Sequence, residues 1–239
     1  MPAALRKAWV LLNIIVATVI IAPIVLFVGL FDWRKRIMGF LPALWGRWLL
    51  WSLGLTATVR GLENLEKGHQ YIFVCNHASA IDIMLAVSYL PGTVAFMAKK
   101  SLFKVPLFGW GIAAIGSIPV DRSTRIRAQQ SVDVAVRRLR RTVVNMILYP
   151  EGTRTRDGHL QPFKSGGFLL AIRSGIPIVP VAVKGTFEAL PSGGLNLTAV
   201  PVSLTIGQPV STSGLADDDR NQLKDQAYRA VSDLLGAAV

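Results

Sequence analysis

An uncharged run near the amino terminus limits what this chain can fold into more than any other feature. Residues 8–31 form 24 consecutive positions without a charged side chain. As a helix, this run is about 36 Å long, which exceeds the roughly 30 Å hydrocarbon core of a bilayer. A signal peptide has a shorter apolar region, about 7–15 residues, followed by small residues at a cleavage site. Here the basic segment 34–36 follows instead, so the run predicts a retained membrane segment.

A second apolar stretch, residues 37–55, carries Arg47 and lies among four tryptophans, Trp33, Trp45, Trp48 and Trp51. Tryptophan favours the membrane–water boundary, because its ring is apolar while its N–H needs a polar partner. A hairpin that crossed the bilayer twice would place the basic run outside, against the positive-inside tendency. Two arrangements stay open. Either the first segment spans and the second lies at the cytoplasmic interface, or both enter one leaflet only.

After about residue 56 the chain alternates short apolar strands with helices, which is typical of an α/β fold with a largely parallel sheet. We expect strands at 71–75, 93–98, 117–120, 143–149, 177–183 and 200–206, and helices at 81–89, 107–115, 125–141, 166–174 and 215–235. The composition shifts near residue 56. The sequence therefore predicts membrane-anchoring helices over residues 1–57. Residues 58–239 are expected to form a largely parallel mixed sheet flanked by helices.

The chain is strongly basic, with 26 Lys and Arg against 14 Asp and Glu and a net charge of +12. Such a balance indicates an anionic partner, which can be a phospholipid surface, a phosphorylated substrate or nucleic acid. The apolar segment and the lack of a recognition motif argue against nucleic acid. A single cysteine and three scattered histidines argue against a disulfide framework and a zinc site.

Residues 76–82 (Asn-His-Ala-Ser-Ala-Ile-Asp) end a predicted strand and begin a predicted helix, where ligands bind in open α/β sheets. His77 can take a proton near neutral pH, and a carboxylate on its other ring nitrogen would fix its tautomer. His77 and Asp82 can meet only if His77 lies in the turn and Asp82 in the first turn of the helix. The alternative is structural: Ser79 caps the helix, with Asp82 completing a variant of the capping box.

Two further strand ends deliver arginines. Residues 149–154 read Tyr-Pro-Glu-Gly-Thr-Arg, a tight turn whose backbone N–H groups could face an anion. Arg154 in this turn offers a planar fork that suits phosphate. Residues 116–122 place Arg122 in the same way at the end of a short strand. Each of these two segments, taken alone, is also consistent with an ordinary surface turn whose arginine is solvated.

Together and in this order, these segments resemble the glycerolipid acyltransferase family, and within it the 1-acylglycerol-3-phosphate acyltransferases of bacterial membranes. Its four motifs are matched by residues 76–82, 116–122, 149–154 and 176–181, with Tyr149 where the family has phenylalanine. The match covers about residues 56–190. The first and third motifs are the specific ones.

The resemblance implies transfer of a fatty acyl group from acyl-CoA or acyl carrier protein to the sn-2 hydroxyl of lysophosphatidic acid. The product is phosphatidic acid, for phospholipid biosynthesis. His77 would be the general base and Asp82 would orient it, with no metal and no further cofactor. The expected substrate-binding residues are Arg122 and Arg154 for the phosphate, together with Lys100, Glu151, Gly152 and Thr153. Cys75 adjoins His77, but the alternation of side chains along a strand assigns it to the core.

The same resemblance places the chain at the inner membrane of the cell, with its catalytic domain on the cytoplasmic side and phospholipid as a partner. The role of Glu151 stays open: it fixes the loop or helps to place the glycerol, or it is a structural carboxylate that tethers a nearby arginine. The cluster 137–141 is expected to meet anionic headgroups or an acidic carrier protein. Alternative acceptors are glycerol-3-phosphate, a lyso-ornithine lipid or a lysophospholipid, because loops rather than motifs shape the acceptor site. A basic membrane scaffold without catalysis is a more distant alternative.

Overall fold

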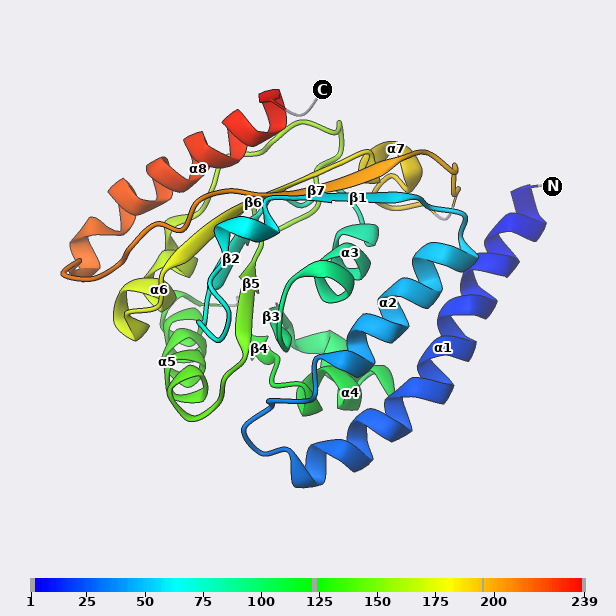
Figure 1. Ribbon diagram of the computed structural model, residues 1–239, viewed down its shortest axis with the longest axis horizontal. Helices are drawn as coiled ribbons and strands as arrows, with labels where there is room; N and C mark the ends of the chain where they lie inside the picture. The colour runs from blue at the N-terminus through cyan, green and yellow to red at the C-terminus, as the bar shows by residue number, and fades with distance from the viewer. Residues whose placement is uncertain (1–2, 122–123, 195, 238–239) are drawn as a thin grey trace.

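The computed structural model describes residues 3–121, 124–194 and 196–237. Its centre is a seven-stranded sheet in the order β1-β7-β6-β2-β5-β3-β4 (Figure 1). Every neighbouring pair is parallel except β6 and β7, which are antiparallel. The predicted α/β fold with a largely parallel, mixed sheet is therefore confirmed. The strands are β1 (Ala57–Arg60), β2 (Ile72–Cys75), β3 (Val94–Lys99), β4 (Ile118–Val120), β5 (Asn145–Leu148), β6 (Ile178–Lys184) and β7 (Val202–Ile206).

Helices cover both faces of this sheet. Helices α5, α6 and α8 pack on one face, and α2 and α3 pack on the other, with α1 and α4 outside them. The α-helices are α1 (Ala3–Phe31), α2 (Phe40–Ser52), α3 (Ile81–Tyr89), α4 (Phe108–Ala114), α5 (Arg125–Arg141), α6 (Phe168–Ser174), α7 (Thr186–Ala189) and α8 (Arg220–Ala237). Short 3-10 turns are η1 (Leu62–Asn64), η2 (Lys100–Lys104), η3 (Ser165–Gly167) and η4 (Asp217–Asp219).

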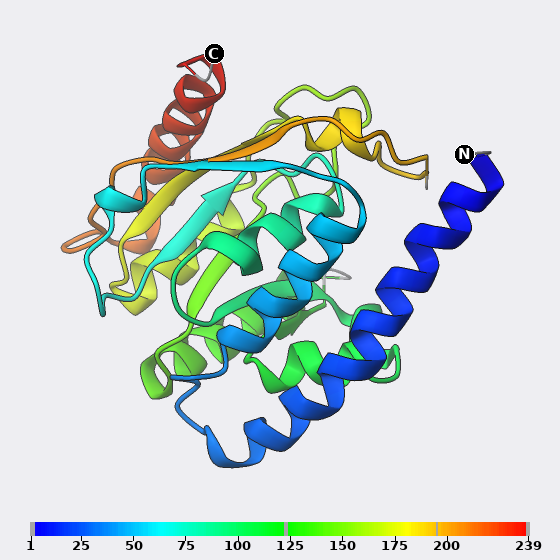
Figure 2. The ribbon, with the colours of Figure 1, turned by 45° about the vertical axis from the view of Figure 1, so that its right-hand side comes forward.

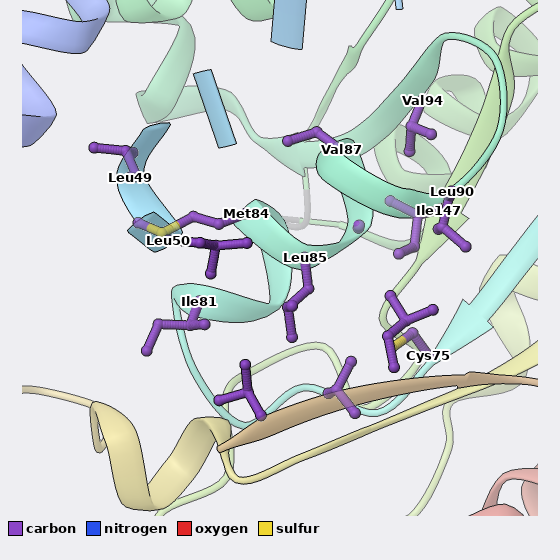
Figure 3. Close-up of a cluster of buried hydrophobic side chains, with 14 of the residues drawn as sticks. Leu49, Leu50, Cys75, Ile81, Met84, Leu85, Val87, Leu90, Val94 and Ile147 are labelled. Carbon is purple, nitrogen blue, oxygen red and sulfur yellow. The ribbon is translucent and has the colours of Figure 1, made fainter. Parts of the chain in front are cut away.

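Strand β2 is buried on both faces, which explains its uninterrupted apolar sequence. Ile72 and Val74 belong to the core under α5, α6 and α8, whereas Phe73 and Cys75 belong to the core under α2 and α3. Figure 3 shows Cys75 beside the side chains of α3, with Leu49 of α2 beyond them. Cys75 is 1% exposed, so its predicted place in the core is confirmed. This packing fixes the end of β2, where the motif with His77 begins.

The amino-terminal helices pack against the rest of the chain along their length. Helix α1 is, among the described residues, the one helix long and apolar enough to cross a membrane. Its inner face contributes Val10, Ala17, Ile21 and Val25 to the same core as α2 and α3. Figure 2 shows α2 lying between α1 and α3. The core continues across residue 57, and the division into residues 1–57 and 58–239 stays a prediction.

Candidate active site

The turn between β2 and α3 brings His77 and Asp82 together. Nδ1 of His77 lies 2.8 Å from Oδ2 of Asp82. The same oxygen accepts hydrogen bonds from the backbone N–H groups of Ala78 (2.7 Å) and Ser79 (2.8 Å). Asp82 is fully buried, whereas 16% of the His77 side chain is exposed. The imidazole is thus fixed from behind by a buried carboxylate, and its outer edge stays accessible.

The capping alternative is present in part. The Asp82 carboxylate accepts the Ser79 N–H, which is one half of a capping box. The other half is missing, because Oγ of Ser79 accepts from the N–H of Ile81 (3.2 Å) and donates to the carbonyl of Leu190 (2.8 Å). Asp82 therefore serves the helix start and the imidazole at once.

Tyr149, the residue that departs from the family motif, covers one face of the imidazole. The two ring centroids lie 4.1 Å apart with an angle of 24° between the planes. The Tyr149 hydroxyl is buried and has no hydrogen-bond partner among the described residues. Burial raises the pKa of Tyr149 well above its usual value, and the proximity of Cys75 and Asp82 raises it further. The His77 ring is thus held at its edge by Asp82 and across its face by Tyr149.

Glu151 lies behind the His77 turn. Its Oε1 accepts the backbone N–H of His77 (2.7 Å) and its Oε2 that of Gln161 (3.3 Å). The pKa of Glu151 is raised to about 7. Burial is the main cause and the charge of Asp82 adds to it, while the two backbone N–H groups oppose the shift. Of the roles left open by the sequence, the geometry fits the fixing of the loop. Among the described residues, Glu151 forms no ion pair with an arginine.

A cavity of about 850 Å³ opens beside His77 and Tyr149. Its polar end is lined by Lys99, Lys100, Asp121, Gly152, Thr153 and Arg154. Its apolar part is lined by α1, α2 and α4, with Ile21, Ala22, Val25, Trp45, Phe108 and Ile112 among the lining residues. Polar groups at one end and apolar walls at the other are what an amphiphilic ligand needs. This wall could not be predicted from the sequence, since no local motif marks α1 or α4 as part of a site.

Four of the six residues predicted to bind substrate line this cavity: Lys100, Gly152, Thr153 and Arg154. Glu151 is not among the described residues that line it, because both of its oxygens are used on backbone N–H groups. Glu151 supports the turn through these bonds, and its predicted contact with substrate stays a prediction. Arg122 lies outside the described residues.

The turn of residues 149–154 needs its glycine. Gly152 has φ +80°, a left-handed conformation that side chains rarely adopt. A Cβ there would also lie 2.9 Å from Nζ of Lys164. The lysine amine therefore lies over the turn, where it could meet a bound anion.

Comparison with known proteins gives a consistent result. A family model described as Acyltransferase matches residues 56–184. A 1-acyl-sn-glycerol-3-phosphate acyltransferase from Limnanthes douglasii is 37% identical over 168 residues, 70% of this chain and 59% of that protein. The Saccharomyces cerevisiae protein of the same name is 34% identical over 186 residues, 77% of this chain and 61% of its own. The Salmonella typhimurium protein is 31% identical over 170 residues, 71% of this chain and 69% of its own.

The chain spans about six tenths of the length of the first plant relatives that it matches. A solved structure agrees with it over nearly its whole length. The crystal structure of the 1-acyl-sn-glycerophosphate (LPA) acyltransferase PlsC from Thermotoga maritima superposes with a TM-score of 0.82 and 27% identity. That agreement covers 99% of this chain and 98% of the other.

Proposed function

Because this chain belongs to the acyltransferase family, we propose that it transfers a fatty acyl group from a thioester to the sn-2 hydroxyl of lysophosphatidic acid, giving phosphatidic acid. One observation carries the proposal. The imidazole of His77, bound to a buried carboxylate, opens onto a cavity with a cationic end and an apolar end. Lysophosphatidic acid has the matching parts, a phosphate, a hydroxyl and an acyl chain.

His77 would act as the general base. When the Nδ1–H group donates a hydrogen bond to the Asp82 carboxylate, Nε2 carries the free lone pair. Nε2 can then accept the proton of the substrate hydroxyl. The hydroxyl oxygen forms a bond to the thioester carbonyl carbon, and the carbon–sulfur bond then breaks. The thiolate leaves with the proton returned by the imidazolium. The buried charge of Asp82 stabilises the imidazolium between these two steps.

The phosphate would bind at the polar end of the cavity. Arg154 and Lys100 both line this end, and Lys164 lies over Gly152 at its margin. A guanidinium can hold two phosphate oxygens at once, which fixes the hydroxyl relative to His77. Arg122 is proposed for the same role on the strength of the motif alone.

The acyl donor would be acyl-CoA or acyl carrier protein, with no metal or other cofactor. We propose that the protein sits at the cytoplasmic side of the inner membrane, with lipid as partner. For the amino-terminal helices, entry into one leaflet fits better than a first segment that spans the bilayer. Helix α1 packs against α2 and α4 rather than leaving the domain.

An acyl-transfer assay with labelled thioester tests the proposed activity. Purified protein should acylate lysophosphatidic acid in preference to glycerol-3-phosphate, a lyso-ornithine lipid and lysophosphatidylcholine, with each of the two donors tried in turn. No transfer to lysophosphatidic acid with either donor, by protein that is folded, would reject the proposal. Preference for another acceptor would keep the chemistry and change the substrate.

Two variants test the assigned roles. His77→Ala should lower kcat by about 10³-fold, since a general base contributes 10²–10⁴. His159→Ala, at an exposed histidine, should not change kcat.

Arg154→Ala should raise KM for lysophosphatidic acid by about 10- to 100-fold, because it removes a charged hydrogen bond to the phosphate. Arg156→Ala removes a nearby arginine that is not among the cavity's described lining residues, and should leave KM as it is.

A further inference from the structure

Two basic segments about a hundred residues apart in sequence lie side by side. One is the turn between α1 and α2, and the other is the last turn of α5. The backbone N–H of Val143, just after α5, donates to the carbonyl of Arg34 (3.0 Å). Figures 1 and 2 both show the two segments at the same end of the molecule. We call their seven cations the basic face: Arg34, Lys35, Arg36, Arg137, Arg138, Arg140 and Arg141.

The basic face has little opposing charge. In the described ranges, none of its seven residues forms an ion pair. Asp32, on the same turn, accepts the backbone N–H groups of residues 36–38. Asp133, on α5, binds Arg173 at 2.8 Å. The neighbouring loop, whose Gln70 reaches the carbonyl of Thr142, adds Glu66 and Lys67, whose charges cancel.

The positive charges are also close enough to influence one another. Burial lowers the pKa of Lys35; the charge of Asp32 opposes this shift and the charge of Arg138 adds to it. Nζ of Lys35 is held by the carbonyl of Gly29 (3.3 Å), which fixes the turn at the end of α1. The arginines on its surface, Arg34, Arg36, Arg137, Arg140 and Arg141, are exposed.

Exposed apolar side chains flank the same turn. Trp33 and Ile37 are each 68% exposed, and Phe40 is 70% exposed. The guanidinium carbon of Arg34 lies 5.6 Å from the centroid of the Trp33 ring. Aromatic rings beside arginines are typical of segments at the headgroup level of a bilayer. A purely electrostatic contact with an acidic protein would not require these exposed apolar side chains.

A hollow of about 480 Å³ adjoins this turn, with Arg36 and Arg47 in its lining. Nε of Arg47 donates to the carbonyl of Ser88 (3.3 Å), and its guanidinium lies 5.8 Å from the centroid of the Tyr89 ring. The charge of Arg47 is thus held in place at the wall of the hollow. Its position beside the apolar turn suits the phosphate of a lipid headgroup.

We propose that the basic face binds the surface of an anionic lipid leaflet, as a second, electrostatic attachment beyond the apolar contact of α1. The phosphates of acidic lipids would meet arginines of α5 while Trp33 and its apolar neighbours enter the interface. The attachment orients the domain on the membrane and gives it a preference for acidic lipid. The inference concerns attachment alone and does not depend on which acceptor the protein acylates.

A competition between two vesicle populations tests this inference. Full-length protein is diluted from detergent into a mixture of phosphatidylcholine vesicles and denser vesicles with 30% phosphatidylglycerol, and is then separated by flotation. The readout is the ratio of protein bound to the anionic vesicles to protein bound to the neutral vesicles. The apolar contribution of α1 is common to both populations and cancels in this ratio. Wild-type protein should favour the anionic vesicles at low salt and lose that preference at high salt.

The variant Arg137→Gln/Arg141→Gln should lower the ratio by about 25-fold, since each basic residue near an anionic surface contributes about fivefold. Arg60→Gln/Arg229→Gln removes the same charge from β1 and α8 and should leave the ratio unchanged. Arg137→Lys/Arg141→Lys keeps the charge and should keep most of the preference.

Three outcomes would overturn the inference: no anionic preference in the wild type, an equal loss in both double glutamine variants, or an unchanged ratio in Arg137→Gln/Arg141→Gln. A selective loss of acyl transfer from carrier protein but not from CoA, with an unchanged vesicle ratio, would instead identify the basic face as a carrier-protein surface. Acyl transfer in neutral detergent micelles, measured on the same samples, shows separately whether the enzyme is functional.

Discussion

Asp82 uses one carboxylate oxygen for the imidazole and for two backbone N–H groups, so a change of charge at this residue can be separated from a change of shape. In Asp82→Asn the amide oxygen can still accept these three hydrogen bonds, but the imidazolium loses its counter-charge. We expect kcat to fall by about 10³-fold or more, with little change in KM for lysophosphatidic acid. Asp133→Asn makes the same change at the remote ion pair with Arg173 and should not alter kcat. Near-normal turnover by folded Asp82→Asn would contradict the assigned role.

Cys75 tests whether an acyl-enzyme intermediate is needed. Burial raises the pKa of its thiol well above the usual value, and the charges of Asp82 and Glu151 raise it further, so the thiolate is disfavoured. Cys75→Ala should therefore keep kcat and cost roughly 1 kcal/mol of unfolding free energy for the lost core packing. A steady-state assay and a denaturant titration measure the two quantities. A large loss of kcat at intact stability would point to a covalent route through sulfur.

Tyr149 separates the effect of a stacked ring from that of a buried hydroxyl. Tyr149→Phe removes a hydroxyl that has no hydrogen-bond partner among the described residues. It should keep kcat and raise the free energy of unfolding by about 1 kcal/mol. Tyr149→Leu removes the ring that lies 4.1 Å from the imidazole, and should lower kcat by up to about tenfold. Equal kcat values for the two variants would show that stacking has no effect.

At the scale of elements, Glu151 joins the turn after β2 to the loop after β5. Its pKa is raised to about 7 in the folded protein from 4.5, so the folded state binds the proton more tightly than the unfolded state. The carboxyl group therefore favours folding below about pH 4.5, and this contribution is lost as pH rises through 7. Glu151→Gln should remove that slope. Melting temperatures between pH 4.5 and 8 should fall less steeply for Glu151→Gln, and parallel curves would refute the linkage.

The contact of α2 with α3 depends on Gly46. A Cβ at Gly46 would lie 2.7 Å from the carbonyl oxygen of Met84 and 2.8 Å from Cγ2 of Val87. Gly46→Ala should therefore force the helices apart and cost about 1–3 kcal/mol of unfolding free energy. In Gly236→Ala the new Cβ meets nothing within 4 Å, and the change in α8 should be neutral or stabilising by up to about 1 kcal/mol. Urea titrations compare the two, and equal midpoints would refute this packing argument.

Local chemistry explains which elements the sequence could predict. Helix α5 has the predicted bounds, because Thr124 caps it and its apolar residues recur at helical spacing. Strand β1 was missed, since two of its four residues are exposed, the other two are only partly buried, and it pairs with β7, far away in the sequence. The antiparallel pairing of β6 with β7 likewise depends on tertiary packing.

The same distinction holds for the site. His77 and Asp82 are five residues apart, and their pairing follows from the geometry of one turn. The bond between Glu151 and the backbone of His77 joins residues 74 positions apart, which no local pattern reveals. Helices α1 and α2 contribute to the apolar wall of the cavity. The sequence indicated only a membrane-anchoring role for these two helices.

For the molecule as a whole, the position of α1 relates the membrane to the cavity. Near its start, Nε1 of Trp9 donates to the carbonyl of Ser52 (3.0 Å), and in its middle Oγ1 of Thr18 accepts from Nε1 of Trp45 (3.2 Å). Beyond its end, the carbonyl of Lys35 accepts from Oγ1 of Thr93 (2.7 Å). Helix α1 is thus held against the domain along its length. If it crossed the bilayer in this position, polar parts of the domain would enter the hydrocarbon core, where unpaired polar groups are costly.

Lys7 and Arg34 flank the apolar part of α1 and therefore report on its orientation. We expect both ends to lie on one side, because the outer face of α1 is apolar while its inner face packs on the domain. In a Cys75→Ala background, Lys7→Cys and Arg34→Cys should both react with an impermeant maleimide in sealed inside-out vesicles. Neither should gain label when detergent opens the vesicles. Labelling of only one position before detergent, and of both after it, would show instead that α1 spans the bilayer.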